Sequence, residues 1–246
     1  MDNNRKGKPC VGLDIGTMTI VGAWTGEKGN TEVKQMRDVF VDVDIQVKKM
    51  MKLADVSFIP KKDRSDQFVV VGDSALRFVN LLKQELRRPL SKGVISPGET
   101  DAQYVLVALI KNVLGPPVTE GEHCFYSVPA APLDDPDQDI VYHTEIFRRI
   151  LTDLGYTAHP ANEAMAVIYS QCPNENFSGI AASFGAGMVN VALAYQTVCG
   201  LSFSVSRGGD WVDRNAAKAM GTSSARMCSL KEKGVIFSYR YECRGY

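Results

Sequence analysis

The sequence predicts an α/β fold in which β-sheets and helices pack in layers. Two observations carry this prediction. Apolar runs of strand length are interspersed with amphipathic stretches of helical period, and a strand, a glycine turn and a second strand occur twice, at 11–21 and 180–191. The 246 residues are enough for one large domain or two modest ones. We therefore expect a globular chain with two related sheet-forming segments.

Composition and charge exclude several classes of protein. Lys and Arg (28) balance Asp and Glu (28), so the net charge of zero provides no basic field for nonspecific nucleic-acid binding. No apolar run reaches the roughly 18 residues of a membrane span, and the first residues lack the apolar core of a signal peptide. We expect a cytoplasmic protein with no transmembrane segment and no nucleic-acid partner.

The cysteines and histidines point to structure rather than chemistry. The six cysteines are scattered without a CxxC pair, and the three histidines have no Ser or Cys partner of the kind that a nucleophilic triad needs. We expect reduced cysteines that act as small apolar residues.

Alternating or continuous apolar runs predict the strands, which are bounded by Gly, Pro, Asn and Asp. The predicted ranges are Cys10–Asp14, Thr19–Trp24, Val33–Phe40, Phe68–Val71, Cys124–Val128, Gly179–Ser183, Met188–Ala194 and Gly200–Val205.

The helices are predicted from apolar spacing together with signals at their ends. Thr100 and Gln103 have the spacing of a capping box at the start of the first helix. The other expected ranges are 138–154 with Gly155 as its stop, 163–171 stopped by Pro173, and a helix from Asp210, as N-cap, to near Gly221. An acidic segment interrupted by proline, 132–138, precedes the second of these helices.

The repeated hairpins align in phase when Asp14-Ile15-Gly16 is laid on Ser183-Phe184-Gly185. Each turn contains glycine, which allows a positive φ or a close approach of the backbone to a ligand. Two such turns facing each other would present backbone N–H groups to an anion such as a phosphate chain. The alternative is a pair of ordinary hairpins.

Several short segments, in this order along the chain, resemble motifs of the superfamily of actin, DnaK-type chaperones and sugar kinases. Within it the sequence is most similar to bacterial actin-like proteins of the MreB and MamK kind. The segments are Asp14-Ile15-Gly16-Thr17, Arg88–Ile95, Ser127–Ala130, Asn162–Ala166, Ser183–Asn190, Gly208–Asp213 and Leu230–Lys233.

The resemblance implies an actin-like (ribonuclease H-like) fold of duplicated β-sheet domains with flanking helices. Residues 1–160 would form the first half, with a small outer subdomain at about 44–86, and residues 161–246 would form part of the second half. From the resemblance we expect the chain to be C-terminally truncated relative to the family and its second half to be incomplete. We therefore expect apolar surface of the second sheet to lack part of its cover.

The resemblance also implies a site for ATP and Mg²⁺ between the halves. Asp14 would hold the hydration shell of the metal ion, and Glu163 would orient the attacking water. Gln138 and Asp139 are weaker candidates for that second role. The N–H groups around the phosphates would come from Gly16, Thr17 and Met18 on one side and from Ser183, Gly185, Ala186 and Gly187 on the other, and the nucleoside contacts from Gly209, Lys231 and Glu232.

Simpler interpretations of these residues stay open. Asp14 could cap a turn, Glu163 could be an ordinary acidic residue of a first helical turn, and Lys231-Glu232 could belong to a solvated helix face. One departure from the family bears on chemistry. The second turn normally begins with Asp, and Ser183 cannot supply that negative charge, so Mg²⁺ binding and ATP hydrolysis should be weaker.

The function implied by the resemblance is that of an actin-like ATP-binding protein of a bacterial cytoskeletal filament, which assembles with copies of itself in a nucleotide-dependent way. ATPase activity is expected from the resemblance alone. The alternatives are a non-hydrolysing actin-like binding module and a fragment of a DnaK-type chaperone ATPase.

Overall fold

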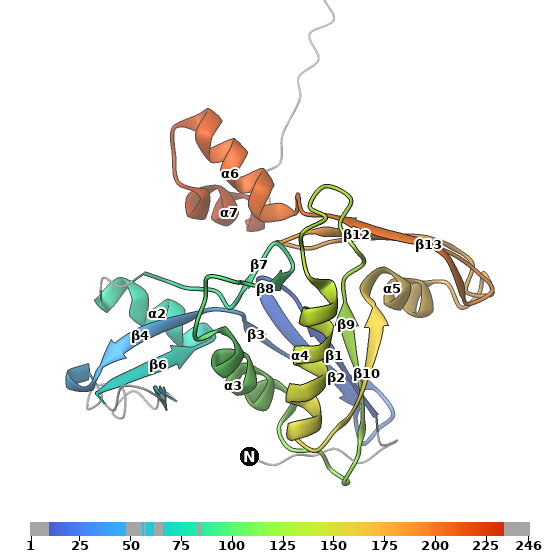
Figure 1. Cartoon of the computed structure of the whole chain (residues 1–246), viewed down its shortest axis with the longest axis horizontal. Helices are drawn as coiled ribbons and strands as arrows, with labels where there is room; N and C mark the ends of the chain where they lie inside the picture. Colours follow the sequence, from blue (N-terminus) through green and yellow to red (C-terminus); the bar gives the residue numbers. More distant parts are fainter. Residues whose placement is uncertain (1–9, 48–55, 57, 62–65, 83–84, 234–246) are drawn as a thin grey trace, which may run out of the picture.

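The fold is described from a computed structural model, at residues 10–47, 56, 58–61, 66–82 and 85–233 (Figure 1). Helices lie between some of the strands, as predicted. The first part contains β1 (Cys10–Ile15), β2 (Thr19–Thr25), β3 (Thr31–Arg37), β4 (Phe40–Asp44), η1 (Ile45–Val47), β5 (Phe58–Pro60), β6 (Gln67–Val71), α2 (Asp73–Leu82), β7 (Leu90–Ser91) and β8 (Val94–Ile95). The second part contains α3 (Ala102–Leu114), β9 (His123–Val128), α4 (Ile140–Asp153), β10 (Thr157–Asn162), α5 (Glu163–Gln171), β11 (Gly179–Phe184), β12 (Val189–Tyr195), β13 (Val198–Val205), α6 (Gly209–Met220) and α7 (Ser224–Glu232).

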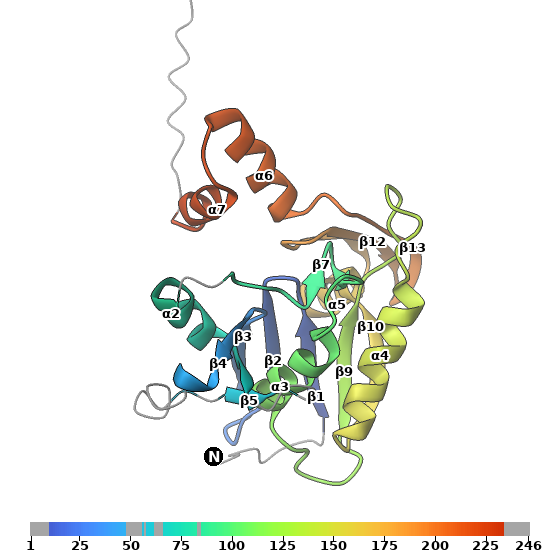
Figure 2. The ribbon, with the colours of Figure 1, turned by 60° about the vertical axis from the view of Figure 1, so that its left-hand side comes forward.

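The main sheet has five strands in the order β10-β9-β1-β2-β3. β9 pairs in parallel with β1 and β10, whereas β2 pairs antiparallel with β1 and β3. Alternation along β1 buries Val11, Leu13 and Ile15 under α3 and α4, which lie side by side on that face (Figures 1 and 2). The carboxyl end of β1 is thereby fixed, and the first glycine turn follows it directly.

A small outer sheet, in the order β4-β6-β5, packs against α2. The single strand predicted over Val33–Phe40 is wrong, because the chain leaves the main sheet after Arg37 and enters the outer sheet at Phe40. The two strands lie in different sheets although no Gly or Pro separates them in the sequence.

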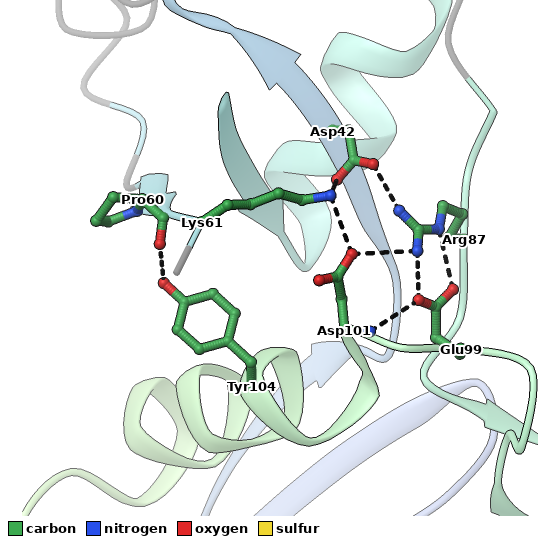
Figure 3. A network of polar contacts seen from close by, with 7 residues as sticks. All are labelled: Asp42, Pro60, Lys61, Arg87, Glu99, Asp101 and Tyr104. Atoms are coloured by element: carbon green, nitrogen blue, oxygen red, sulfur yellow. Dashed lines mark hydrogen bonds and ion pairs between the residues drawn. The ribbon is translucent and has the colours of Figure 1, made fainter. Parts of the chain in front are cut away.

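An ion-pair network fixes the outer sheet to the main body (Figure 3). Arg87 pairs with Asp42 of β4 at 2.5 Å, with Asp101 at 3.2 Å and with Glu99. Lys61 pairs with Asp42 and Asp101, each at 3.0 Å. Because Asp101 directly precedes α3, the network joins the outer sheet to the helix that covers the main sheet.

The second sheet has the order β11-β12-β13 and is covered by α5 on one face only (Figures 1 and 2). The apolar side of α5 packs on small residues of β11 and β12, which are Ala181, Ala192 and Ala194. The opposite face carries large apolar side chains that are 44–80% exposed and are covered by no described residue: Ile180, Phe184, Leu193, Tyr195 and Leu201. This agrees with the expectation of an incompletely covered second sheet.

The helix ends follow the predicted signals in most cases. α5 has the predicted range, and Gly155 (φ 94°) and Gly221 (φ 61°) adopt the left-handed conformation just past α4 and α6. Two predicted caps are wrong. α3 is preceded by Asp101 rather than by a Thr100–Gln103 capping box, and Asp210 lies inside the first turn of α6 rather than before it. No helix among the described residues is long and apolar enough to cross a membrane.

Candidate functional site

The two glycine turns are closed in the same way. Gly16 donates its N–H to the carbonyl of Thr19 at 3.1 Å, and Gly185 donates to the carbonyl of Met188 at 2.9 Å. A Cβ atom on either glycine would lie 2.9 Å or 3.0 Å from that same carbonyl oxygen. The sequence alignment of the two turns therefore corresponds to one local geometry, in which a side chain at the glycine would strike the carbonyl that closes the hairpin.

The turns come from different sheets and meet at Gly187. A Cβ atom on Gly187 would lie 2.2 Å from Thr17 Oγ1 and 2.3 Å from the backbone nitrogen of Gly93, in the β7–β8 turn. Thr17 is buried, and its hydroxyl oxygen accepts a hydrogen bond from that Gly93 N–H at 3.0 Å. Three backbone turns thus converge on one point.

Two carboxylates lie beside these turns. Asp14 is exposed, and its Oδ1 accepts from the hydroxyl of Ser127 at 2.6 Å. The hydroxyl oxygen of Ser127 in turn accepts from the N–H of Ile15 at 2.9 Å. Ser127 therefore holds the side chain of Asp14 and the backbone of the first turn together, rather than Asp14 capping the turn itself.

Glu163, at the first position of α5, has both carboxylate oxygens engaged. Oε1 accepts from the hydroxyl of Ser183, and Oε2 accepts from Asn190 Nδ2 at 2.8 Å. Burial raises the pKa of Glu163, the hydrogen bond from Ser183 lowers it, and the nearby charge of Asp14 raises it. Glu163 and Asp14 thus interact across the two sheets, and Asn190 extends the contact by accepting from the N–H of Ala130 at 3.0 Å.

The start of α6 lies directly on the second turn. The N–H of Gly209 donates to the carbonyl of Gly185 at 2.9 Å, and the N–H of Asp210 donates to the carbonyl of Ala186 at 2.8 Å. Because these contacts use the first N–H groups of the helix, they orient α6 relative to the turn. An anion would therefore be contacted by N–H groups of the turns and not by those at the start of α6.

The predicted nucleoside residues connect α6, α7 and the main sheet. Lys231 Nζ pairs with the buried carboxylate of Asp213 at 2.8 Å and reaches the carbonyl of Gly209 at 3.5 Å. Glu232 pairs with Arg37, at the end of β3, at 3.2 Å. Both side chains are paired but remain exposed, so the roles of Lys231 and Glu232 toward a nucleoside stay a prediction.

Another ion pair joins the two parts of the chain. Arg88 pairs with Asp210 at 2.8 Å. The charge of Arg88 also acts on Asp38. The carboxylate of Asp38 is fully buried and has no hydrogen-bond partner among the described residues. Burial raises the pKa of Asp38 well above its usual range, and the charge of Arg88 offsets part of this effect. The N–H of Asp38 donates to the carbonyl of Met18 at 2.9 Å, so this buried group adjoins the first turn.

The weaker candidates for orienting water lie elsewhere. Gln138 donates to Ser206 Oγ at 3.1 Å and to Asp135, and Asp139 caps α4 by accepting from the N–H of Tyr142 at 2.7 Å. Among the described residues, neither Gln138 nor Asp139 has a polar contact with Asp14 or Glu163. Sequence reasoning missed Ser127, Asn190 and Arg88 as partners, although all three lie in segments that carry the family resemblance.

This donor set could hold a divalent cation through one carboxylate together with water and phosphates. The described residues contain no cluster of three or more His, Cys, Asp or Glu side chains placed to hold a metal ion. Mg²⁺, however, keeps several waters and binds through one or two carboxylates together with substrate phosphates. The exposed carboxylate of Asp14 at the rim of the turns fits that role, whereas the hydroxyl of Ser183 does not add a second charge.

Comparisons with known proteins find solved structures of similar fold. The structure is similar to that of MamK in a double helical filament (20% identity, TM-score 0.67) and to MreB5 of Spiroplasma citri bound to ADP (14% identity, TM-score 0.62). The similarity covers 91% and 94% of this chain, and the chain spans 64% of each of the other two. MreB5 bound to AMPPNP matches with 15% identity and a TM-score of 0.62, over 92% of this chain and 62% of that one.

A comparison with curated proteins finds no significant match. A protein-family profile described as Volactin matches residues 10–243, which is nearly the whole sequence. The chain therefore belongs to the Volactin family and has the actin-like fold of the MreB and MamK proteins.

Proposed function

We propose that this chain binds ATP between its two glycine turns and assembles with copies of itself into filaments. The observation that carries the proposal is the convergence of the turns at Gly187, beside the carboxylates of Asp14 and Glu163. Structures of MreB5 with ADP and with AMPPNP, and of MamK in a filament, support it by similarity of fold.

In this proposal each turn contributes backbone donors. The N–H groups of Thr17 and Met18 and those of Ala186 and Gly187 contact the phosphates from two sides. Mg²⁺, held through water by Asp14, would neutralise charge on the phosphates. Lys231 and Glu232 position the nucleoside. Their ion pairs with Asp213 and Arg37 hold α7 against α6 and β3.

Filament assembly would use head-to-tail contacts between copies, because such contacts stay open when the rotation between neighbours does not close a ring. The test is high-speed sedimentation of the full chain with ATP, ADP, AMPPNP or no nucleotide. We expect pelleted protein with ATP and AMPPNP and much less without nucleotide. Equal pelleting in all four conditions would contradict nucleotide-dependent assembly.

A second candidate function, a binding module that does not hydrolyse ATP, is favoured by the contacts of Glu163. Ser183 and Asn190 each occupy an acceptor site of the Glu163 carboxylate, which leaves fewer of its roughly four lone-pair sites for a water molecule. We expect slow phosphate release from the wild type and faster release from Ser183→Asp, which adds the missing charge beside the metal. Rapid release by the wild type would exclude this candidate.

A further inference from the structure

A long groove lies between α3, α4 and the β7–β8 turn, with a volume of about 1190 Å³. Its lining includes one stripe of α4 from Asp139 through Tyr142 and Ile146 to Asp153, so the groove follows the whole helix, about 20 Å. α3 and α4 lie beside each other in both views of the fold, with β7 and β8 at one end (Figures 1 and 2). Of the residues considered above for the nucleotide site, the two weaker candidates for orienting water, Gln138 and Asp139, line this groove, and Asp14, Glu163 and the residues of the two glycine turns do not.

The floor of the groove is apolar. Val107 of α3 and Ile146 and Ile150 of α4 contribute to it, together with Val94 and Ile95 of the hairpin. An apolar lining of this kind can pack against the apolar stripe that an amphipathic helix presents at i, i+3, i+4 and i+7.

A buried donor without a partner lines the same groove. His143 is 1% exposed, and its Nδ1 accepts from the N–H of Ile95 at 3.2 Å, so that Nε2 carries the proton. Burial lowers the pKa of His143 to about 4, which keeps the ring neutral. Nε2 has no hydrogen-bond partner among the described residues, and neither does the buried Oε1 of Gln138. Native interiors seldom leave such groups unsatisfied.

The charge of the groove is negative. Seven charged side chains line it, of which five are acidic and two basic: Glu99, Asp135, Asp137, Asp139, Asp153, Lys92 and Arg149. Both basic groups are already paired with acidic groups of the groove, Lys92 with Asp135 at 2.8 Å and Arg149 with Asp153 at 3.8 Å.

The charge that remains lies at one end. Asp137 and Asp139, from the acidic segment that precedes α4, have no ion-pair partner among the described residues, and Asp139 accepts only from the backbone of its own helix. Glu99 is held by Arg87 outside the groove. An occupant would therefore bring positive charge to the amino-terminal end of α4.

We propose that this groove binds a basic amphipathic helical segment of a partner protein. Apolar residues of the segment would cover the floor, and its Lys and Arg would pair with Asp137 and Asp139. The volume exceeds the roughly 300–1,000 Å³ of typical small-molecule pockets, and the length suits a helix of about four turns. The groove adjoins the proposed nucleotide site through the β7–β8 turn, but it contains neither Asp14 nor Glu163.

The test is fluorescence anisotropy of a labelled synthetic peptide of about 16 residues, with Leu on one helical face and Lys and Arg beside it. Two control peptides have the same length. One replaces Lys and Arg by Glu, and the other has the same composition in a scrambled order. We expect saturable binding of the basic helix to the full chain, about tenfold or more tighter than either control and weakened by salt. No binding at millimolar concentration, or equal binding of the scrambled peptide, would overturn the proposal.

Two matched charge reversals locate the site. Asp137→Lys acts in the groove, and Glu145→Lys makes the same change on α4 outside the groove lining, where Glu145 is half exposed. Asp137→Lys should weaken binding about tenfold and Glu145→Lys less than about twofold, with unchanged thermal unfolding in both. Equal effects would place the peptide elsewhere. Self-association of the chain that Asp137→Lys abolishes, without peptide binding, would identify a second copy as the occupant and also overturn the proposal.

Discussion

Replacing Gly187 by Ala is the sharpest perturbation of the two-turn arrangement. The added Cβ atom would lie 2.2 Å from Thr17 Oγ1 and 2.3 Å from the nitrogen of Gly93, whereas ordinary van der Waals contact begins at 3.4 Å. The turns would therefore have to separate by more than 1 Å (order of magnitude). Both obstructing atoms belong to one hydrogen bond, Gly93 N–H to Thr17 Oγ1, so the movement would strain or break it.

Gly187→Ala should lower both the stability of the fold and the affinity for ATP. Overpacking of this kind typically lowers the free energy of unfolding by about 1–3 kcal/mol. A displacement of about 1 Å between the phosphate-binding turns should weaken ATP binding by about 10- to 100-fold. Gly98→Ala is the matched control, because a Cβ atom there meets nothing within 4 Å.

Urea denaturation and a titration with a fluorescent ATP analogue measure both quantities in the wild type and the two variants. Gly98→Ala should behave as the wild type in both assays. If Gly187→Ala also matched the wild type in stability and affinity, the close contact between the turns would be refuted.

Three further predictions follow from buried charge and uncovered surface. Burial raises the pKa of Asp38, so the native state binds more protons than the unfolded state, and stability should fall as pH rises above about 4. Asp38→Asn should not lose stability in this way and should be about 1–3 kcal/mol more stable than the wild type in urea at pH 8. If the stabilities of the two proteins changed in parallel with pH, Asp38 would not be the cause. Lys231→Met leaves the buried carboxylate of Asp213 unpaired and should lower stability by about 1–3 kcal/mol, whereas Glu232→Gln, at an exposed pair, should lower it by less than about 1 kcal/mol. Phe184→Ser removes an 80% exposed ring from the open face of the second sheet and should reduce binding of an apolar dye and self-association with little change in stability; unchanged dye binding would mean that the face is covered.

The sequence predicted the hairpins and α5 because their signals are local. Each hairpin combines strand alternation with a glycine at the turn, and α5 has Asn162 as its N-cap, which accepts from the N–H of Met165 at 3.1 Å. The break between β3 and β4 has no such signal, because no Gly or Pro lies between Thr31 and Asp44. β10 escaped prediction because it contains Pro160, which the strand tolerates at the edge of the main sheet.

The candidate site was only partly predictable for a similar reason. Asp14, Glu163 and Ser183 lie in segments with a recognisable motif, so their positions could be expected. Their partners depend on contacts between distant parts of the chain, such as Ser127 with Asp14 and Arg88 with Asp210. Spacing along the sequence carries no information about such pairs. The hydrogen bond between Ser183 and Glu163 likewise depends on the packing of β11 against α5, which the sequence does not reveal.

The most direct test of the account is isothermal titration calorimetry of ATP into the full chain, with and without Mg²⁺, for the wild type and Gly187→Ala. We predict one binding site per chain, a modest gain in affinity with Mg²⁺ because Asp14 acts without a second carboxylate at Ser183, and a loss of affinity in Gly187→Ala. Absence of ATP binding to the folded wild type, or binding that Gly187→Ala leaves unchanged, would contradict the proposal that the two turns form a nucleotide site.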